Sequence, residues 1–404
     1  MSAPLHLAVA LDGAGWHPGA WAETGVRPGA LFTPGYWADL VARAESGLLD
    51  LVTIEDGLRL QSEASLDDDP RTDRIRGRLD AVQIAARVAP LTQRIGLLPT
   101  AVVTHTEPFH LSKAIATLDY VSRGRAGVRV QVDASAVSAR HLGRREQPAI
   151  SLRDYAAGDP AAAAVVADLF TEAGDYVEVL RRLWDSWEDD AEIRDVATGR
   201  FVDVDRLHYI DFEGSRFSVR GPSITPRPPQ GQPIVAALAH AQIPFTLVAD
   251  HTDLGFLTPH SNAEAAELVT RLRALRLAGP AAAEPLHLWA DLVVVLGETD
   301  AHARSRLARL DDLAGAPFRS DAELFVGTPT GLADLLADWH STGLTGFRLR
   351  PAVLPDDLDR IVTDLTPELR RRGLVRTAYE ADTLRGHLGL TRPANRYAPV
   401  GAHR

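Results

Sequence analysis

Residues 94–133 read RIGLLPTAVVTHTEPFHLSKAIATLDYVSRGRAGVRVQVD and contain two strand-like runs on either side of one helical stretch. The runs cover residues 95–103 and 126–132 and are dominated by apolar side chains. Between them, residues 111–122 repeat apolar side chains at the three- and four-residue spacing of a helix. A strand, a helix and a second strand in this order are typical of a unit whose two strands are parallel. The segment therefore predicts an α/β protein built on a parallel sheet.

The same alternation continues from one end of the chain to the other. Eight runs are strand-like: 5–11, 51–55, 95–103, 126–132, 233–239, 254–258, 286–296 and 346–350. The helical stretches are 36–46, 80–90, 111–122, 175–187, 265–277, 301–314 and 331–339. Eight alternating strands predict a (β/α)8 TIM barrel. An open doubly wound sheet would show the same alternation, but no GxGxxG motif follows the first run, as a dinucleotide fold would require.

The chain is predicted to form one barrel domain over residues 1–390. The interval between the fourth and fifth strands is too long for one crossover and ends in the Pro- and Gly-rich text GPSITPRPPQGQP, so residues 134–232 are interpreted as an insertion. Residues 391–404 lack periodicity and are expected to wrap the surface or to be loose.

Composition excludes several classes of function. The formal charge of -11 disfavours nucleic acid, and the absence of cysteine excludes disulfides and thiolate chemistry. No apolar run reaches the length of a membrane span, and the first residues lack the basic region of a signal peptide, so we expect a cytoplasmic protein with no membrane contact. The sequence contains no HExxH motif, no paired metal-ligand spacing and no GxSxG motif, so we infer neither a metal site nor a serine hydrolase.

Several stretches resemble, in order, the bacterial luciferase-like flavin-dependent monooxygenase family, in its branch of nitrilotriacetate, dibenzothiophene-sulfone and long-chain alkane monooxygenases. They span nearly the whole chain and comprise LTQRIGL (91–97), residues 106–127, 177–195, 202–233 and 368–398. The resemblance implies a luciferase-like TIM barrel that binds reduced FMN supplied by a separate flavin reductase. It also implies that one oxygen atom of O2 is inserted into a small organic substrate, with the cofactor carrying the chemistry.

Barrel enzymes carry their working residues at the carboxyl ends of strands, where the comparison with the family is most informative. Asp56 closes the second strand and matches an acidic position that in the family approaches the flavin; a capping or solvated role is the alternative. At the third strand, Val102 replaces a hydroxyl-bearing residue and His105 replaces a tyrosine. His105 thereby becomes a candidate catalytic group.

The fourth strand departs furthest from the family. Its relatives read roughly GRAGWNIVTS where this chain reads GRAGVRVQVD (124–133), which places Arg129 and Asp133 among the cofactor positions. Side chains alternate along a strand, so Arg129, Gln131 and Asp133 are predicted to share one face. An internal ion pair between Arg129 and Asp133 and a role in ligand binding are both open at this point.

Two histidines complete the candidate set. After the fifth strand, Ala239, His240 and Ala241 replace the Gly-Ser-Ser turn that binds phosphate in the family, and His240 retains the ability to donate to a phosphate. His17 follows the first strand, where it could protonate or orient an intermediate, or be an ordinary loop residue. An FMN site rebuilt around Asp56, Arg129 and His240 is the leading hypothesis.

Two other functions are consistent with these altered positions. The first is a flavin-free, non-catalytic subunit or binding protein that partners an active relative. The second is the same barrel with a deazaflavin, whose different tail would explain the changed phosphate contacts. We also expect a homo-oligomer or a heterodimer with a relative.

Overall fold

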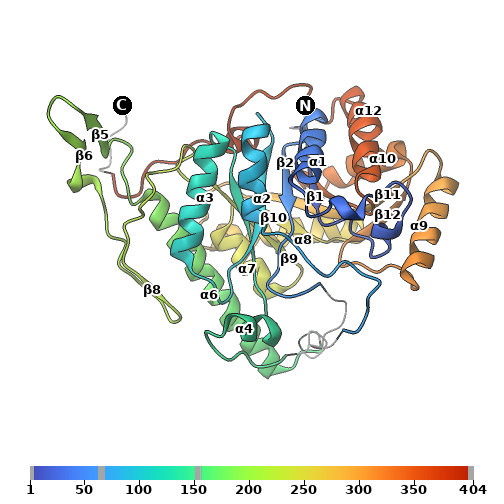
Figure 1. Ribbon diagram of the computed structural model, residues 1–404, viewed down its shortest axis with the longest axis horizontal. Coiled ribbons are helices and arrows are strands. Elements are labelled where there is room, and N and C mark those ends of the chain that lie inside the picture. Colours follow the sequence, from blue (N-terminus) through green and yellow to red (C-terminus); the bar gives the residue numbers. More distant parts are fainter. Residues whose placement is uncertain (1–3, 62–68, 151–154, 156, 399–404) are drawn as a thin grey trace.

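The computed structural model describes residues 4–61, 69–150, 155 and 157–398. Its centre is a closed parallel barrel surrounded by helices (Figure 1). The eight barrel strands are β1 (His6–Leu11), β2 (Leu51–Ile54), β3 (Gly96–Val102), β4 (Gly127–Gln131), β9 (Ile234–Ala239), β10 (Leu254–Leu257), β11 (His287–Leu296) and β13 (Gly346–Pro351). The predicted TIM barrel is confirmed, because each strand-like run of the sequence forms one of these strands.

Strand pairing shows how the barrel closes. The strands follow one another in the order β10-β9-β4-β3-β2-β1-β13-β11, and β10 pairs with β11 to complete the ring. A further strand, β12 (Glu323–Gly327), pairs with the second half of β11 and was not predicted. Because β11 is ten residues long, its first half pairs with β10 while residues 292–296 remain available to β12.

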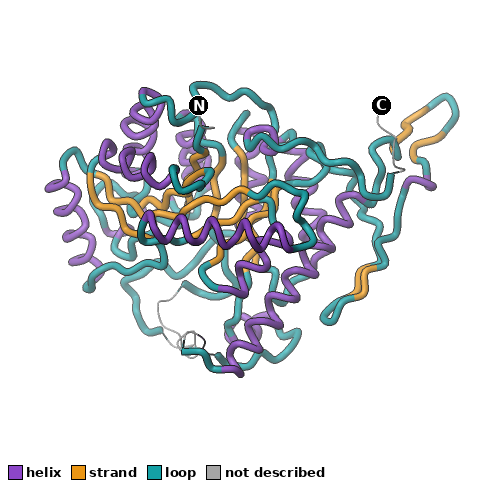
Figure 2. Tube along the Cα trace, turned by 180° about the vertical axis from the view of Figure 1, so that it is seen from behind, coloured by secondary structure: helices purple, strands orange, loops and turns teal. Residues whose placement is uncertain are grey.

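Helices cover the outside of the barrel on all sides (Figure 2). The larger ones are α1 (Pro34–Ser46), α2 (Ala81–Val88), α3 (Pro108–Ser122), α6 (Pro160–Asp185), α7 (Gln242–His251), α8 (Asn262–Ala278), α9 (Asp300–Ala314) and α10 (Pro329–His340). The shorter ones are α4 (Ala136–Leu142), α11 (Asp356–Arg360), α12 (Thr366–Arg371) and α13 (Leu384–His387). All seven predicted helices form, whereas α7 was not predicted.

The long interval after β4 contains both a barrel helix and a projecting arm. Its helix α6 packs against α3 and α7 and so belongs to the outer ring. The arm consists of two antiparallel hairpins, β5 (Glu192–Asp195) with β6 (Arg200–Val202) and β7 (Phe212–Glu213) with β8 (Ser218–Val219), which extend from one side of the molecule (Figure 1).

The described part of the predicted tail lies against the base of this arm. Asn395 Nδ2 donates to the carbonyls of Asp185 and Trp187 at 2.8 Å, and the ring of Tyr397 stacks on His208 at 5.0 Å. Residues 399–404 lie outside the described residues. Within residues 4–61, 69–150, 155 and 157–398, no helix combines the length and apolar composition of a membrane span.

Side-chain alternation divides each strand between two environments. Val128 and Val130 of β4 pack in the main apolar core beneath the helices, while Arg129 points into the barrel. At the amino-terminal end the barrel is filled with apolar side chains, including Phe256 and Trp289. The predicted register of β4 is therefore confirmed, and the paired arginines and carboxylates of the interior lie toward the carboxyl ends of the strands.

His287, at the amino-terminal end of β11, gives the fold a dependence on pH. Its Nε2 lies 2.9 Å from the Leu388 carbonyl and its Nδ1 lies 3.1 Å from Thr345 Oγ1, a pattern that suits a neutral ring. Burial, followed by the nearby His6, lowers the pKa of His287 from 6.5 to about 4.

We predict that the free energy of unfolding decreases as the pH falls from about 6.5 to about 4, by at most about 3 kcal/mol from this group. The unfolded chain binds the proton more readily than the folded one over that window, so acid favours unfolding. Urea denaturation at several pH values should show a shallower dependence in His287→Gln. The exposed control His302→Gln should behave as wild type; equal slopes in all three proteins would contradict the prediction.

Candidate active site

A network of six charged side chains fills the carboxyl half of the barrel. Three are arginines and three are carboxylates, so the charges balance: Arg129, Arg348, Arg350, Glu55, Asp291 and Asp321. Asp291 lies between Arg348, whose Nε is 2.8 Å from its Oδ1, and Arg350, whose Nε is 2.9 Å from its Oδ2. The network joins β4, β11 and β13 with the residues that follow β2 and precede β12.

Burial makes this pairing obligatory, because an unpaired charge in a barrel interior is costly. Arg348 and Asp291 have no exposed side-chain surface. Although burial opposes the shift, the two arginines lower the pKa of Asp291. Burial lowers the pKa of Arg129 to about 10 against the opposing effect of Glu55, so its guanidinium remains protonated at neutral pH.

Aromatic rings complete the surroundings of two of these arginines. The guanidinium of Arg348 lies 4.1 Å from the ring centre of Phe256, and that of Arg350 lies 4.5 Å from the ring centre of Trp16. Both contacts allow a cation–π attraction, which is strongest where water is excluded. Trp16 thus connects the buried network to the cavity above it.

We predict that Asp291→Asn lowers the free energy of unfolding by about 3–5 kcal/mol, because it leaves two buried arginines without their shared carboxylate. Asp321→Asn should cost less, since the Asp321 side chain is 43% exposed and water can replace it. Equilibrium denaturation in urea measures both. Equal losses for the two variants would show that the barrel interior is more hydrated than its geometry indicates.

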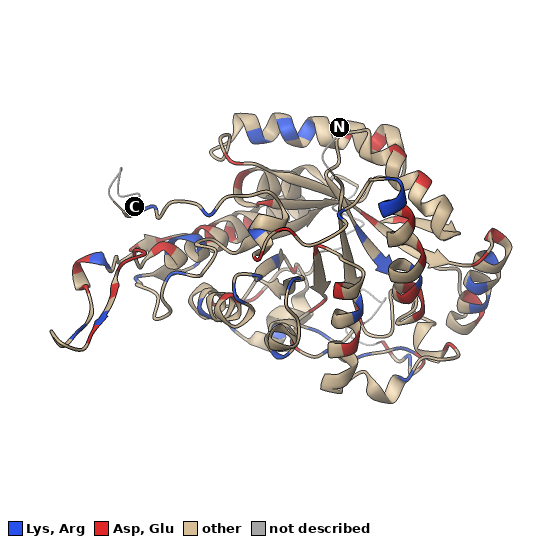
Figure 3. Ribbon diagram, turned by 90° about the horizontal axis from the view of Figure 1, so that it is seen from above, with Lys and Arg blue, Asp and Glu red and all other residues tan. Residues whose placement is uncertain are grey.

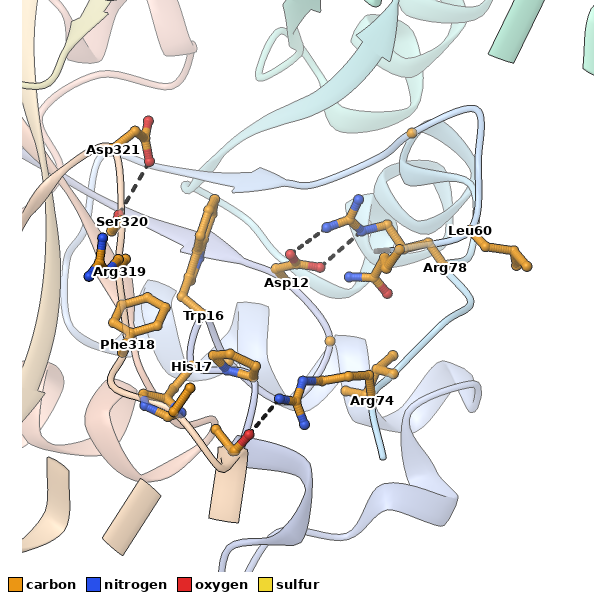
Figure 4. A pocket seen from close by; sticks show the side chains of 18 of the residues that line it. Asp12, Trp16, His17, Leu60, Arg74, Arg78, Phe318, Arg319, Ser320 and Asp321 are labelled. Carbon is orange, nitrogen blue, oxygen red and sulfur yellow. Dashed lines mark hydrogen bonds and ion pairs between the residues drawn. The ribbon is translucent and has the colours of Figure 1, made fainter. Parts of the chain in front are cut away.

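A cavity of about 760 Å³ opens at the carboxyl ends of the strands, directly above this network. Its lining comes from the loops after β1 and β2, from residues 74–78, from Gln131 and from the α9–β12 segment 314–321. Figure 4 shows Trp16 and His17 in the middle, with Phe318 and Arg319 on one side and Leu60 and Arg78 on the other. The volume lies in the range of small-molecule and cofactor sites, and its position is that of active sites in TIM barrels.

His17 lies in the wall of this cavity, as its position after β1 suggested. Its Nε2 is 3.1 Å from Asp311 Oδ1, its Nδ1 accepts a hydrogen bond from the Gly19 amide at 3.1 Å, and its ring lies 4.8 Å from that of Phe318. The accepting Nδ1 assigns the proton of a neutral ring to Nε2. These contacts hold the ring in one orientation; a catalytic role for His17 remains a prediction.

Asp56 has the capping role that was one of its two alternatives. Its Oδ1 accepts from the Gly57 amide at 2.7 Å and its Oδ2 accepts from the Ala81 amide at 2.9 Å, where α2 begins. The residue also lines the cavity, and burial raises its pKa. It therefore fastens the start of α2 to the cavity wall; its role in binding the flavin remains a prediction.

The ion pair considered between Arg129 and Asp133 does not form. Arg129 instead reaches across the barrel, where its Nη2 donates to Glu55 and its Nε lies 3.0 Å from Thr100 Oγ1. Asp133 accepts from the Ser135 amide at 2.8 Å and from Ser138 Oγ at 2.5 Å, so it organises the start of α4. Arg129 pairs with Glu55 because its side chain lies inside the barrel, where Glu55, the residue directly after β2, is within reach.

Val102, at the end of β3, and His105, three residues later, are both buried. Val102 is 6% exposed, and its carbonyl accepts from Thr106 Oγ1 at 2.9 Å. His105 is 5% exposed, has a φ of 66°, and neither of its ring nitrogens has a hydrogen-bond partner among the described residues. Burial, followed by the charge of Arg145, lowers the pKa of His105, so the ring is neutral. A left-handed, unsatisfied histidine is typical of functional sites.

His240 occupies a different edge of the barrel mouth. Its Nδ1 is 3.4 Å from Thr258 Oγ1 and 3.8 Å from Asp321 Oδ2, and its side chain is half-exposed. The helix α7 begins two residues later, and its N-cap residue Ala241 supplies no side-chain hydrogen bond to the first amides. A half-exposed imidazole and free helical amides form a surface that suits an anion.

Sequence reasoning missed most of the interior network and the arginines of the cavity. The text GFRLR (346–350) alternates apolar and basic residues, the same signal that singled out Arg129 in β4. Asp291, the single aspartate in the apolar run of β11, indicated a carboxylate that could pair with these arginines. By contrast, nothing in the spacing indicated that Arg59, Arg74, Arg78 and Arg319 would line one cavity. The described residues contain no cluster of three or more metal-ligating side chains.

This arrangement defines an α/β barrel enzyme with a polar cavity at the carboxyl ends of its strands. The family model for luciferase-like monooxygenases matches residues 14–346, and the chain belongs to that family. It is therefore an enzyme of the luciferase-like monooxygenase class.

Individual relatives extend the match over the full length of both proteins. The chain is 27% identical to N-acetyl-S-(2-succino)cysteine monooxygenase of Bacillus subtilis (strain 168) and 26% identical to nitrilotriacetate monooxygenase component A of Aminobacter aminovorans, each over 98% of both chains. Among solved structures, long-chain alkane monooxygenase superposes with a TM-score of 0.82 at 21% identity, covering 96% of both chains. EDTA monooxygenase from Chelativorans sp. BNC1 gives 0.79 at 21% identity, over 96% of this chain and 99% of its own.

Proposed function

We propose that this chain is the oxygenase of a two-component system, which uses reduced FMN from a separate reductase and O2 to oxygenate a small organic substrate. The observation that carries the proposal is the cavity of about 760 Å³ at the carboxyl ends of the strands in a chain of this family. One of the similar proteins is itself named a component, which supports a partner reductase. We place the reaction in the cytoplasm.

The residues at the barrel mouth fit an FMN molecule, but with a different set of contacts from the one first expected. His240 and the first amides of α7 would hold the phosphate, because they are accessible and lack competing side-chain caps. Arg129 is committed to Glu55 and would support the site from below. Asp56 lines the cavity and would contact the remainder of the cofactor. Bound reduced FMN would supply the electrons that activate O2.

The protein's own contribution is to orient the reactants and to exclude water. Trp16 and Phe318 give the cavity aromatic walls, and the network beneath it supplies fixed charges in a buried environment. His17 is the first candidate for proton transfer. Its hydrogen bonds with Asp311 and the Gly19 amide hold the ring, so only small movements are open to it. His105, neutral and unsatisfied, is the second candidate for proton transfer.

A flavin-free partner subunit is not favoured, since relatives matched over 98% of both chains are named monooxygenases. Paired chains do occur among the similar proteins: subunits A and B of pristinamycin IIA synthase of Streptomyces pristinaespiralis match this chain at 26% and 30% identity. A homo-oligomer or a heterodimer with a relative therefore remains a prediction.

The proposal predicts that wild-type protein binds FMN and that His240→Ala weakens FMN binding about tenfold, the usual size of a lost charge-assisted hydrogen bond. Riboflavin, which lacks the phosphate, should bind both proteins equally. Anaerobic titration with oxidised and reduced flavin measures the dissociation constants, and the exposed variant His302→Ala serves as the control.

Absence of FMN binding in wild type, or preference for a deazaflavin over FMN, would overturn the proposed cofactor. Equal losses for FMN and riboflavin in His240→Ala would place the phosphate elsewhere. Oxygen uptake that depends on both reduced FMN and an added organic substrate would support the monooxygenase reaction itself.

A further inference from the structure

Two arginines of the cavity have no partner in the described part of the chain. Arg59 follows β2 and Arg319 precedes β12; both are exposed and line the cavity, and no hydrogen bond or ion pair joins either to the residues that the structure describes. Arg319 lies on one side of the cavity, and Leu60, the neighbour of Arg59, lies on the other (Figure 4). Both side chains belong to the lining of the same cavity.

The other charged groups of the lining, with the exception of Asp56, form ion pairs. Arg78 forms a two-point contact with Asp12, at 3.0 Å between Nε and Oδ1 and 2.5 Å between Nη2 and Oδ2. Asp321 accepts from Arg350 at 2.6 Å. Asp56 accepts hydrogen bonds from two backbone amides, and burial raises its pKa.

Arg74 has a structural role between the walls. Its Nη2 donates to the Ala314 carbonyl at 2.7 Å and its Nη1 lies 2.9 Å from Asp73 Oδ2. The cations left available to a ligand are thus Arg59 and Arg319. This local excess of positive charge contrasts with the formal charge of -11 and with the mixture of acidic and basic residues over the helices (Figure 3). It would draw anions toward the cavity.

The lining of the cavity also has an apolar part. Trp16, Leu60, Ile75 and Phe318 contribute to it. A ligand with two acidic groups joined by an uncharged segment could pair with both arginines and contact these apolar side chains.

We infer that the substrate is a small dianion of this kind, with carboxylates or equivalent acidic groups that bind Arg59 and Arg319. The inference rests on the proposed function, since it names the substrate class of the same cavity. A second source of an acidic group is the FMN phosphate, which Arg59 or Arg319 could also bind. The acidic groups of a substrate and the phosphate of FMN would pair with the arginines in the same way. Comparing the binding of FMN with that of riboflavin, which lacks the phosphate, distinguishes the two.

The test uses purified full-length protein and isothermal titration calorimetry with succinate, glutarate and adipate, each compared with its monomethyl ester. We expect wild type to bind at least one dicarboxylate more tightly than its half-ester. Arg59→Gln and Arg319→Gln should each weaken that binding about tenfold, as loss of a charge-assisted contact does, and should remove the preference over the half-ester. Arg304→Gln, which changes an exposed arginine of α9, is the matched control.

The ratio of riboflavin to FMN dissociation constants is measured in the same proteins and should stay unchanged. A ratio that falls in Arg59→Gln or Arg319→Gln, with dicarboxylate binding unaltered, would assign the arginines to the phosphate and overturn the inference. Equal affinity of wild type for diacid and half-ester, or no binding of any diacid, would also overturn it. Dicarboxylate binding without any FMN binding would instead refute the proposed function and leave the dianion site standing.

Discussion

The contact of Asp291 with Arg348 and Arg350 is the constraint on which the upper half of the barrel depends. Three arginines enter the interior from β4 and β13, and they can remain there only because three carboxylates from other segments meet them. The pairing joins distant parts of the chain and builds a rigid, polar floor for the cavity. The opposite end is filled mainly by apolar side chains, with the rings of His6 and His287 among them.

This constraint changes how the cofactor positions are interpreted. Arg129 occupies a position expected to contact the flavin, yet its guanidinium neutralises Glu55 and cannot leave without exposing a buried charge. Groups available to anions lie instead at the rim, where His240, Arg59 and Arg319 are accessible to solvent. The basic residues of the interior are thus buried and paired, whereas those at the rim are exposed.

Two of the elements that sequence reasoning missed, α7 and β12, have local explanations. Helix α7 contains a proline in its first turn, which a helix tolerates there because that amide has no partner within the helix, but which reads as a breaker in sequence. Strand β12 is five residues long and follows a loop; its pairing depends on the free second half of β11. Both depend on neighbours that become adjacent only when the barrel closes.

The sequence by itself determined the eight strands, the seven predicted helices and the shared face of Arg129 and Gln131, because periods of two and of about 3.6 residues are properties of a single segment. Only the tertiary structure decided which carboxylate Arg129 meets, that Asp133 serves α4, and that arginines from residues 59 and 319 share one cavity. Partner choice follows from closure of the barrel, which brings strand ends together regardless of their separation along the chain.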